Sequence, residues 1–91
     1  MINRIRGEVP LVIEGKTYRL CLTLGALAEI EAGLGLADLS ELDARLARPR
    51  MADVIVILSA LLRGGGQEVD VAALRLDLRD VGKAIAEAFS P

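Results

Sequence analysis

The stretch MADVIVILSALLR, residues 51–63, decides the fold of this chain. Between Val54 and Leu62 only Ser59 is polar, so a helix formed here has no hydrophilic face. A helix that is apolar all round must be covered on several sides, and this one is too short for a bilayer, which needs about 20 apolar residues. We therefore predict a central core helix over residues 51–63. Its aliphatic side chains are expected to be fully buried: Val54, Ile55, Ile57, Leu58, Leu61 and Leu62.

The composition describes a small protein with one aliphatic core. Hydrophobic residues make up 53% of the 91 residues, yet only Tyr18 and Phe89 are aromatic. This length allows a single domain, residues 1–91, with one modest core. The formal net charge of −2 gives no bulk attraction to nucleic acid or to anionic membranes. We therefore expect neither as a partner, and the single cysteine, Cys21, fits a reducing cytoplasm.

Residues 7–22 are predicted to form a β-hairpin. The runs EVPLVI and TYRLCL flank Glu14-Gly15, and a two-residue turn there pairs Ile13 with Lys16. This register turns four apolar side chains toward the core: Val9, Leu11, Tyr18 and Leu20.

The outer face and the outer edge of this hairpin form the candidate partner-binding surface. An uncovered strand edge is a template for strand addition by another chain, and Pro10 blocks a position on the first strand. We therefore favour the edge Thr17 to Leu22; the alternative is that Ile2 to Ile5 covers it. The candidate residues are Val12, Thr17, Arg19 and Cys21.

Caps and stops delimit the helices before the central one. Thr23 is a predicted N-cap and Gly35 a left-handed stop for a helix over residues 24–34. The apolar side of this helix carries Leu24, Leu27, Ile30 and Leu34. Asp38 and Glu41 have capping-box spacing at the start of a helix over residues 39–48, and Pro49 ends it.

Two further helices follow a glycine run. Gly64-Gly65-Gly66 is predicted to be a flexible helix exit, and Asp70 and Asp77 can cap helices over residues 71–76 and 78–89. One continuous helix over both ranges is the alternative, since Leu74, Leu78, Val81, Ile85 and Phe89 keep one helical stripe across them. The predicted fold class is α+β, with an N-terminal two-stranded antiparallel hairpin packed on a bundle of four to five short helices.

The residue types present argue against catalysis. The chain has no histidine, which excludes triads and metal sites built on imidazole. Cys21 faces Glu8 in the predicted register, and a nearby carboxylate disfavours the thiolate. No Asp/Glu run has the spacing of a calcium or magnesium site, and the glycine run lacks the Lys-Ser/Thr of a phosphate-binding loop. We expect no enzyme activity, cofactor or metal.

Two segments resemble a known family. RGEVPLVIEGKTYRLCLTLGALAEIEAGLG, residues 6–35, and ALLRGGG, residues 60–66, resemble the gene transfer agent tail proteins of α-proteobacterial, phage-derived tail gene clusters. In that family a short hairpin leads into an LTLGALAELE-like helix start, which residues 22–31 match. The resemblance implies a protein of the bacterial cytoplasm during particle assembly, acting beside the tail tube and tape-measure proteins.

The resemblance admits two roles. A tube subunit must supply enough strands to close a sheet-lined ring, and this chain offers two. We therefore expect a non-catalytic tail assembly chaperone that binds the tape-measure and tail tube proteins. The alternative is a minor structural, tail tube-associated component of the particle. The third candidate is a small nucleic-acid-binding helical protein that uses the cluster Arg45, Arg48 and Arg50. The chain could also form a homo-oligomer.

Overall fold

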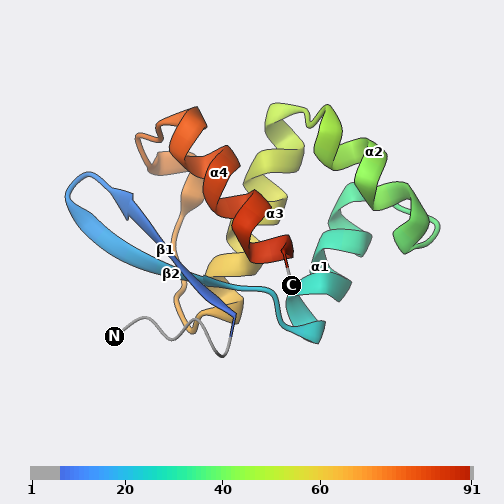
Figure 1. Ribbon diagram of the computed structural model, residues 1–91, viewed down its shortest axis with the longest axis horizontal. Helices are drawn as coiled ribbons and strands as arrows, with labels where there is room; N and C mark the ends of the chain where they lie inside the picture. Colours follow the sequence, from blue (N-terminus) through green and yellow to red (C-terminus); the bar gives the residue numbers. More distant parts are fainter. Residues whose placement is uncertain (1–6, 91) are drawn as a thin grey trace.

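The computed structural model describes residues 7–90 and places a two-stranded hairpin against a set of helices (Figure 1). The α+β prediction is confirmed. Two 3₁₀ turns, η2 and η3, accompany the helices. The elements in chain order are β1 (Glu8–Ile13), β2 (Lys16–Cys21), α1 (Leu24–Leu34), η2 (Leu39–Glu41), α2 (Leu42–Ala47), α3 (Met51–Gly64), η3 (Val71–Ala73) and α4 (Leu78–Phe89).

The hairpin has the predicted register. Glu14 and Gly15 both have positive φ, of 50° and 81°, as a two-residue type I′ turn requires. Ile13 pairs with Lys16 across the turn, and the two strands form an antiparallel sheet. The side chains predicted to face the core are all buried, together with that of Ile13: Val9, Leu11, Tyr18 and Leu20.

Helix α3 is the centre of the core, packing against α1, β2, η3 and α4. From Ile57 onward its apolar side chains are buried as predicted. The prediction is wrong at the start of the helix, where Val54 is half-buried and Ile55 is 38% exposed. Val54 borders an open groove, and within residues 7–90 no element closes over Ile55.

Helix α1 covers the predicted residues and has the predicted caps. The Thr23 hydroxyl oxygen accepts a hydrogen bond from the backbone N–H of Ala26 at 3.0 Å, and Gly35 ends the helix at φ 68°. The predicted apolar side is wrong at Leu24, which is 87% exposed because the buried side of α1 begins only at Ala26. Gly33 allows close packing on α3, since a Cβ there would lie 2.5 Å from Val56 Cγ1.

The remaining boundaries differ in detail from the prediction. The helix expected over residues 39–48 is η2 followed by α2, and the one expected over residues 71–76 is the single turn η3. Asp77 caps α4 by accepting from the backbone N–H of Arg79 at 2.9 Å, so two separate elements are present. The chain is extended at Leu74, which places Leu74 and Leu76 against the core without further helical turns.

Candidate functional site

The hairpin places the four predicted partner-binding residues in two different environments. Val12 and Thr17 are exposed and directly opposite each other, whereas Arg19 and Cys21 are half-buried opposite Pro10 and Glu8. Pairs alternate between hydrogen-bonded and non-hydrogen-bonded along an antiparallel ladder. The Ile13–Lys16 pair that closes the turn is hydrogen-bonded, so by this alternation the Pro10–Arg19 pair is not. The N–H and C=O of Arg19 therefore point away from β1, toward the outer edge of β2.

The outer edge of β2 at Arg19 is covered by the chain that follows α3. The backbone N–H of Arg19 donates to Gln67 Oε1 at 2.7 Å. A Cβ on Gly64 would lie 2.0 Å from the carbonyl oxygen of Cys21, and one on Gly65 would lie 2.2 Å from that of Arg19. Gly64 and Gly65 therefore allow the backbone to pack closely against β2. The prediction that this glycine run is a flexible helix exit is wrong at these two residues.

This packing changes where another strand can dock. Residues 64–67 occupy the edge beside Arg19 and Cys21, whereas the edge at Thr17 stays exposed. Partner binding through Val12, Thr17, Arg19 and Cys21 stays a prediction. The alternative covering segment, Ile2 to Ile5, lies outside the described residues.

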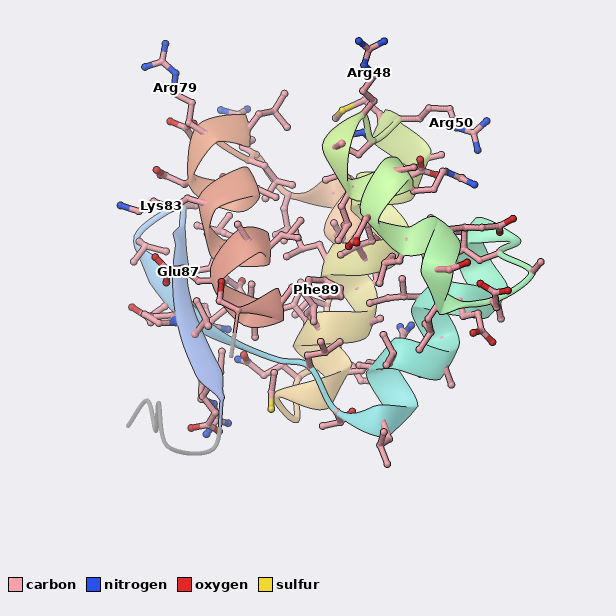
Figure 2. The ribbon with its side chains drawn as sticks, turned by 45° about the vertical axis from the view of Figure 1, so that its right-hand side comes forward. Arg48, Arg50, Arg79, Lys83, Glu87 and Phe89 are labelled. Atoms are coloured by element: carbon pink, nitrogen blue, oxygen red, sulfur yellow. The ribbon has the colours of Figure 1, made fainter. Side chains whose placement is uncertain are left out.

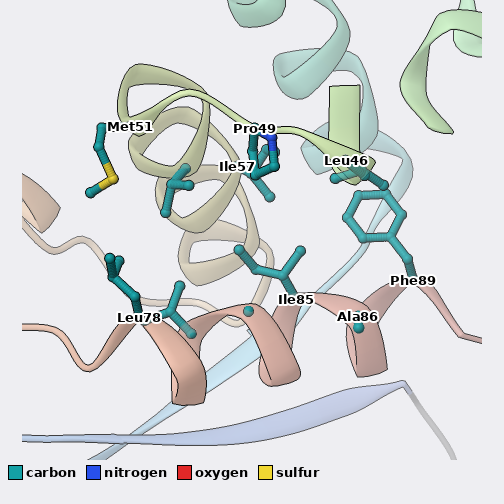
Figure 3. Close-up of a pocket in the computed structure, with 11 residues that line it drawn as sticks. Leu46, Pro49, Met51, Ile57, Leu78, Ile85, Ala86 and Phe89 are labelled. Atoms are coloured by element: carbon teal, nitrogen blue, oxygen red, sulfur yellow. The ribbon is translucent and has the colours of Figure 1, made fainter. Parts of the chain in front are cut away.

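An apolar groove of about 380 Å³ lies between α4 and the α2–α3 region (Figure 3). Met51 and Leu78 stand at one end, and the Phe89 ring lies beside Leu46 at the other. Met51 is 57% and Leu78 55% exposed, so the groove opens to solvent. It is lined by Leu46, Pro49, Met51, Val54, Ile57, Leu78, Val81, Gly82, Ile85, Ala86 and Phe89.

The sequence does not predict the groove, because the apolar residues of α4 form a stripe that is typical of a core-facing helix. Val81 and Ile85 are buried as that stripe predicts, but Leu78 is exposed and Phe89 is half-buried. Gly82 leaves the α4 wall without a side chain, and no heavy atom would lie within 4 Å of a Cβ placed there. A glycine inside an apolar helical stripe was the sequence signal for a hollow at this place.

One end of the groove is basic. Figure 2 shows Arg48 and Arg50 projecting from the α2–α3 connection and Arg79 from the first turn of α4, all at the end that holds Met51 and Leu78. Arg48 and Arg79 are exposed, and within residues 7–90 neither forms an ion pair with a carboxylate. Lys83 and Glu87, on another side of α4, face β1.

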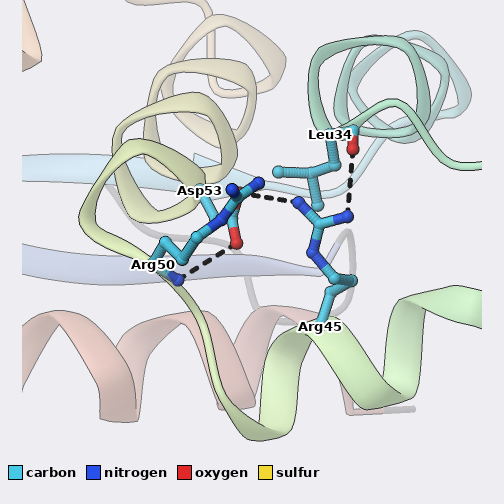
Figure 4. Close-up of polar contacts among 4 residues, drawn as sticks. All are labelled: Leu34, Arg45, Arg50 and Asp53. Atoms are coloured by element: carbon cyan, nitrogen blue, oxygen red, sulfur yellow. Dashed lines mark hydrogen bonds and ion pairs between the residues drawn. The ribbon is translucent and has the colours of Figure 1, made fainter.

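A buried carboxylate anchors the α2–α3 connection (Figure 4). Asp53 accepts from Arg45 Nη2 and from the backbone N–H of Arg50, both at 3.0 Å, and Arg45 Nη1 donates to the Leu34 carbonyl at 3.1 Å. The Arg45 hydrogen bond, followed by that from the Arg50 N–H, holds the pKa of Asp53 below its usual range. Arg45 thus joins the end of α1 to the start of α3, a role that the sequence did not reveal.

Metal-type clusters and membrane-spanning helices are both absent from residues 7–90. Residues 7–90 bring together no group of three or more histidine, cysteine, aspartate or glutamate side chains able to hold a metal ion. Over the same residues, no helix combines the length and the apolar character that crossing a bilayer requires. The groove itself combines an apolar lining with arginines at one end.

Comparison with protein families gives one match over nearly the whole chain. Residues 6–91 match the model of a family described as phage tail tube protein, GTA-gp10. The matched range includes both strands and every residue that lines the groove. Searches of curated proteins and of solved structures found no match.

Proposed function

The chain belongs to the phage tail tube protein family GTA-gp10, and from this we propose that it is a structural, tail tube-associated component of a phage-type tail or gene transfer agent particle. The observation that carries the proposal is the family match over residues 6–91. The name of the family describes a tube constituent, which favours a place in the particle over a passing role in its assembly.

The small sheet limits how such a component could contribute to a tube. Strands β1 and β2 form a two-stranded sheet, and closing a sheet into a barrel or ring requires many more strands. We propose that this chain joins a wall whose sheet comes mainly from other subunits. Its contribution would then be made through helical surfaces, among which the groove is the most apolar opening described above.

A tail assembly chaperone is the second candidate, and the open groove is the observation that favours it. An apolar groove of about 380 Å³ with exposed Met51 and Leu78 could hold an amphipathic segment of the tape-measure or tail tube protein before assembly. Both candidates are non-catalytic and use no cofactor. They differ in whether the protein stays in the finished particle.

Retention in purified particles is therefore the test. A structural component stays with the tail at a fixed ratio to the tail tube protein, whereas a chaperone is lost when particles are purified from the lysate. Absence from intact, tailed particles would contradict the structural proposal and favour the chaperone.

A further inference from the structure

The charges of this chain are separated along its length. From Leu20 to Ala44 there is no lysine or arginine, whereas Arg45, Arg48 and Arg50 follow directly. The carboxylates of the first stretch are Glu29, Glu31, Asp38, Glu41 and Asp43. Glu29 is paired with Arg63 at 2.7 Å. The others make no ion pair with a described residue, so they leave a net negative field around α1, η2 and α2.

Exposed leucines lie within this negative region. Leu24 is 87% and Leu39 46% exposed. Together with Leu27, Ala28 and Glu31 they line a shallow hollow of about 190 Å³. We call this surface the acidic face and define it by Leu24, Leu27, Glu31, Asp38, Leu39 and Glu41.

Asp38 and Glu41 of the acidic face are held in place by hydrogen bonds. Asp38 accepts hydrogen bonds from the hydroxyl and the backbone N–H of Ser40, and these hold the pKa of its carboxyl below the usual range. Glu41 accepts from the backbone N–H of Ala37 at 2.8 Å. These contacts fix the carboxylates beside Leu39, so an approaching cationic surface meets an ordered negative border.

The groove has the complementary character. Its apolar lining is open at Met51 and Leu78, and the exposed guanidinium groups of Arg48 and Arg79, which form no ion pair within residues 7–90, project at that end. Arg50 adds to the positive charge of this end although its guanidinium lies 3.5 Å from Asp53. In both Figure 1 and Figure 2 the first turn of α1, which carries Leu24, lies at the opposite end of the molecule from the first turn of α4, which carries Leu78. One copy therefore cannot fill its own groove with its own acidic face.

We propose that the groove of one copy of this chain binds the acidic face of a second copy. Leucine side chains enter the apolar groove, and Glu31, Asp38 and Glu41 meet the arginine border. A second copy is the favoured occupant because one molecule carries both halves of the complementary pair. The contact joins two different surfaces, so it is heterologous, and repeated copies form a closed ring or an open chain according to the angle between neighbours.

Two matched substitutions separate the two surfaces. Leu78→Glu places a charge in the groove and Leu24→Glu places one in the acidic face. Both residues occupy the first position of a helix and are more than half exposed, so a glutamate there is compatible with folding. Ala72→Glu is the control, because Ala72 is an exposed residue of η3 that belongs to neither surface and lies outside the hairpin.

Sedimentation velocity of the purified full chain over a range of concentrations measures the association. We expect the wild-type chain and the Ala72→Glu variant to associate equally well. Each leucine variant alone should self-associate about 30-fold more weakly, which is the effect of losing an interface hot spot. Raising the salt concentration should weaken the wild-type contact, because exposed charges are screened. Circular dichroism checks that every variant is folded.

Mixing the two leucine variants gives the decisive result. The Leu78→Glu chain keeps an intact acidic face and the Leu24→Glu chain keeps an intact groove, so the mixture should form a one-to-one pair that grows no further. A wild-type chain that stays monomeric at every concentration would overturn the proposal. Self-association of each leucine variant on its own, as strong as that of the wild-type chain, would also overturn it. So would a loss of association in Leu78→Glu but not in Leu24→Glu, because that result indicates a groove-to-groove contact or another occupant of the groove. Particle composition does not enter this test, so its failure is distinct from failure of the tail role.

Discussion

The backbone N–H of Arg19 in β2 donates to the side-chain oxygen Oε1 of Gln67, 48 residues further along the chain, at 2.7 Å. The amide side chain here takes the place of a neighbouring strand at an outward-facing position of the ladder. Together with Gly64 and Gly65, Gln67 lets the end of the central helix protect the sheet, and natural proteins need such protection because open edges promote unwanted pairing.

Replacing Gln67 by alanine should expose this edge. The Arg19 N–H loses its acceptor while the surrounding packing stays, so we expect the free energy of unfolding to fall by about 0.5–1.5 kcal/mol. Hydrogen exchange at the Arg19 amide should become faster. Glu68→Ala, at the next and exposed position, is the control. Unchanged exchange at Arg19 in the Gln67→Ala variant would show that the hydrogen bond does not protect this edge.

Alanine substitutions at two helical glycines should have opposite effects. A Cβ at Gly64 meets the Cys21 carbonyl oxygen at 2.0 Å, so Gly64→Ala should destabilise the protein by about 1–3 kcal/mol through overpacking. A Cβ at Gly82 meets nothing within 4 Å, so Gly82→Ala should stabilise the protein by about 0.5–1 kcal/mol through helix propensity. Urea denaturation measures both. Equal stabilisation by the two substitutions would contradict the close packing of Gly64 on β2.

Asp53→Asn should weaken the junction of α1, α2 and α3. The neutral side chain loses its charge-assisted hydrogen bonds with Arg45 and the Arg50 N–H, which we expect to cost about 1.5–3 kcal/mol at pH 7. Asp43→Asn, an exposed carboxylate of α2, is the control.

The effect of Asp53 should depend on pH in a defined direction. Folding lowers its pKa, so its stabilisation is fully present above the unfolded-state pKa of about 3.9 and is lost as the pH falls through the lower folded-state pKa. The stability difference between the wild-type chain and Asp53→Asn should therefore be constant near neutrality and shrink in acid below about pH 4. A difference that grows on acidification would have the wrong sign for this account.

Leu58→Asp should prevent folding. Leu58 is completely buried within the hydrophobic core, so a carboxylate there would lose its hydration among apolar side chains. Leu58→Ala should leave the chain folded but less stable by about 2–5 kcal/mol. Ile55→Ala, on the exposed part of the same helix, should cost clearly less. Similar losses at Leu58 and Ile55 would mean that α3 is not centred in the core as described.

The sequence predicted the hairpin and the caps of α1 and α4 because these depend on local chemistry; the predicted cap at Asp70 is wrong, since its side chain makes no capping hydrogen bond at η3. Glu14-Gly15 sets the register, and Thr23 and Asp77 cap α1 and α4 with their own side chains. The groove and the β2 edge were not predicted, because each depends on residues far apart in the chain. Gln67 reaches Arg19, and Arg45 reaches Asp53 and Leu34, only after the elements have packed. The apolar pattern of α3 predicted its central position, but it did not predict that Val54 and Ile55 in its first turns are only partly buried.

Quantitative mass spectrometry of purified, tailed particles tests the central claim most directly. The amount of this protein is compared with that of the tail tube protein in the same particles, before and after a high-salt wash, and with its amount in the assembling lysate. A structural, tail tube-associated component gives a fixed, reproducible ratio that survives the wash. Particles with intact tails that have lost this protein, while the lysate retains it, would contradict the account.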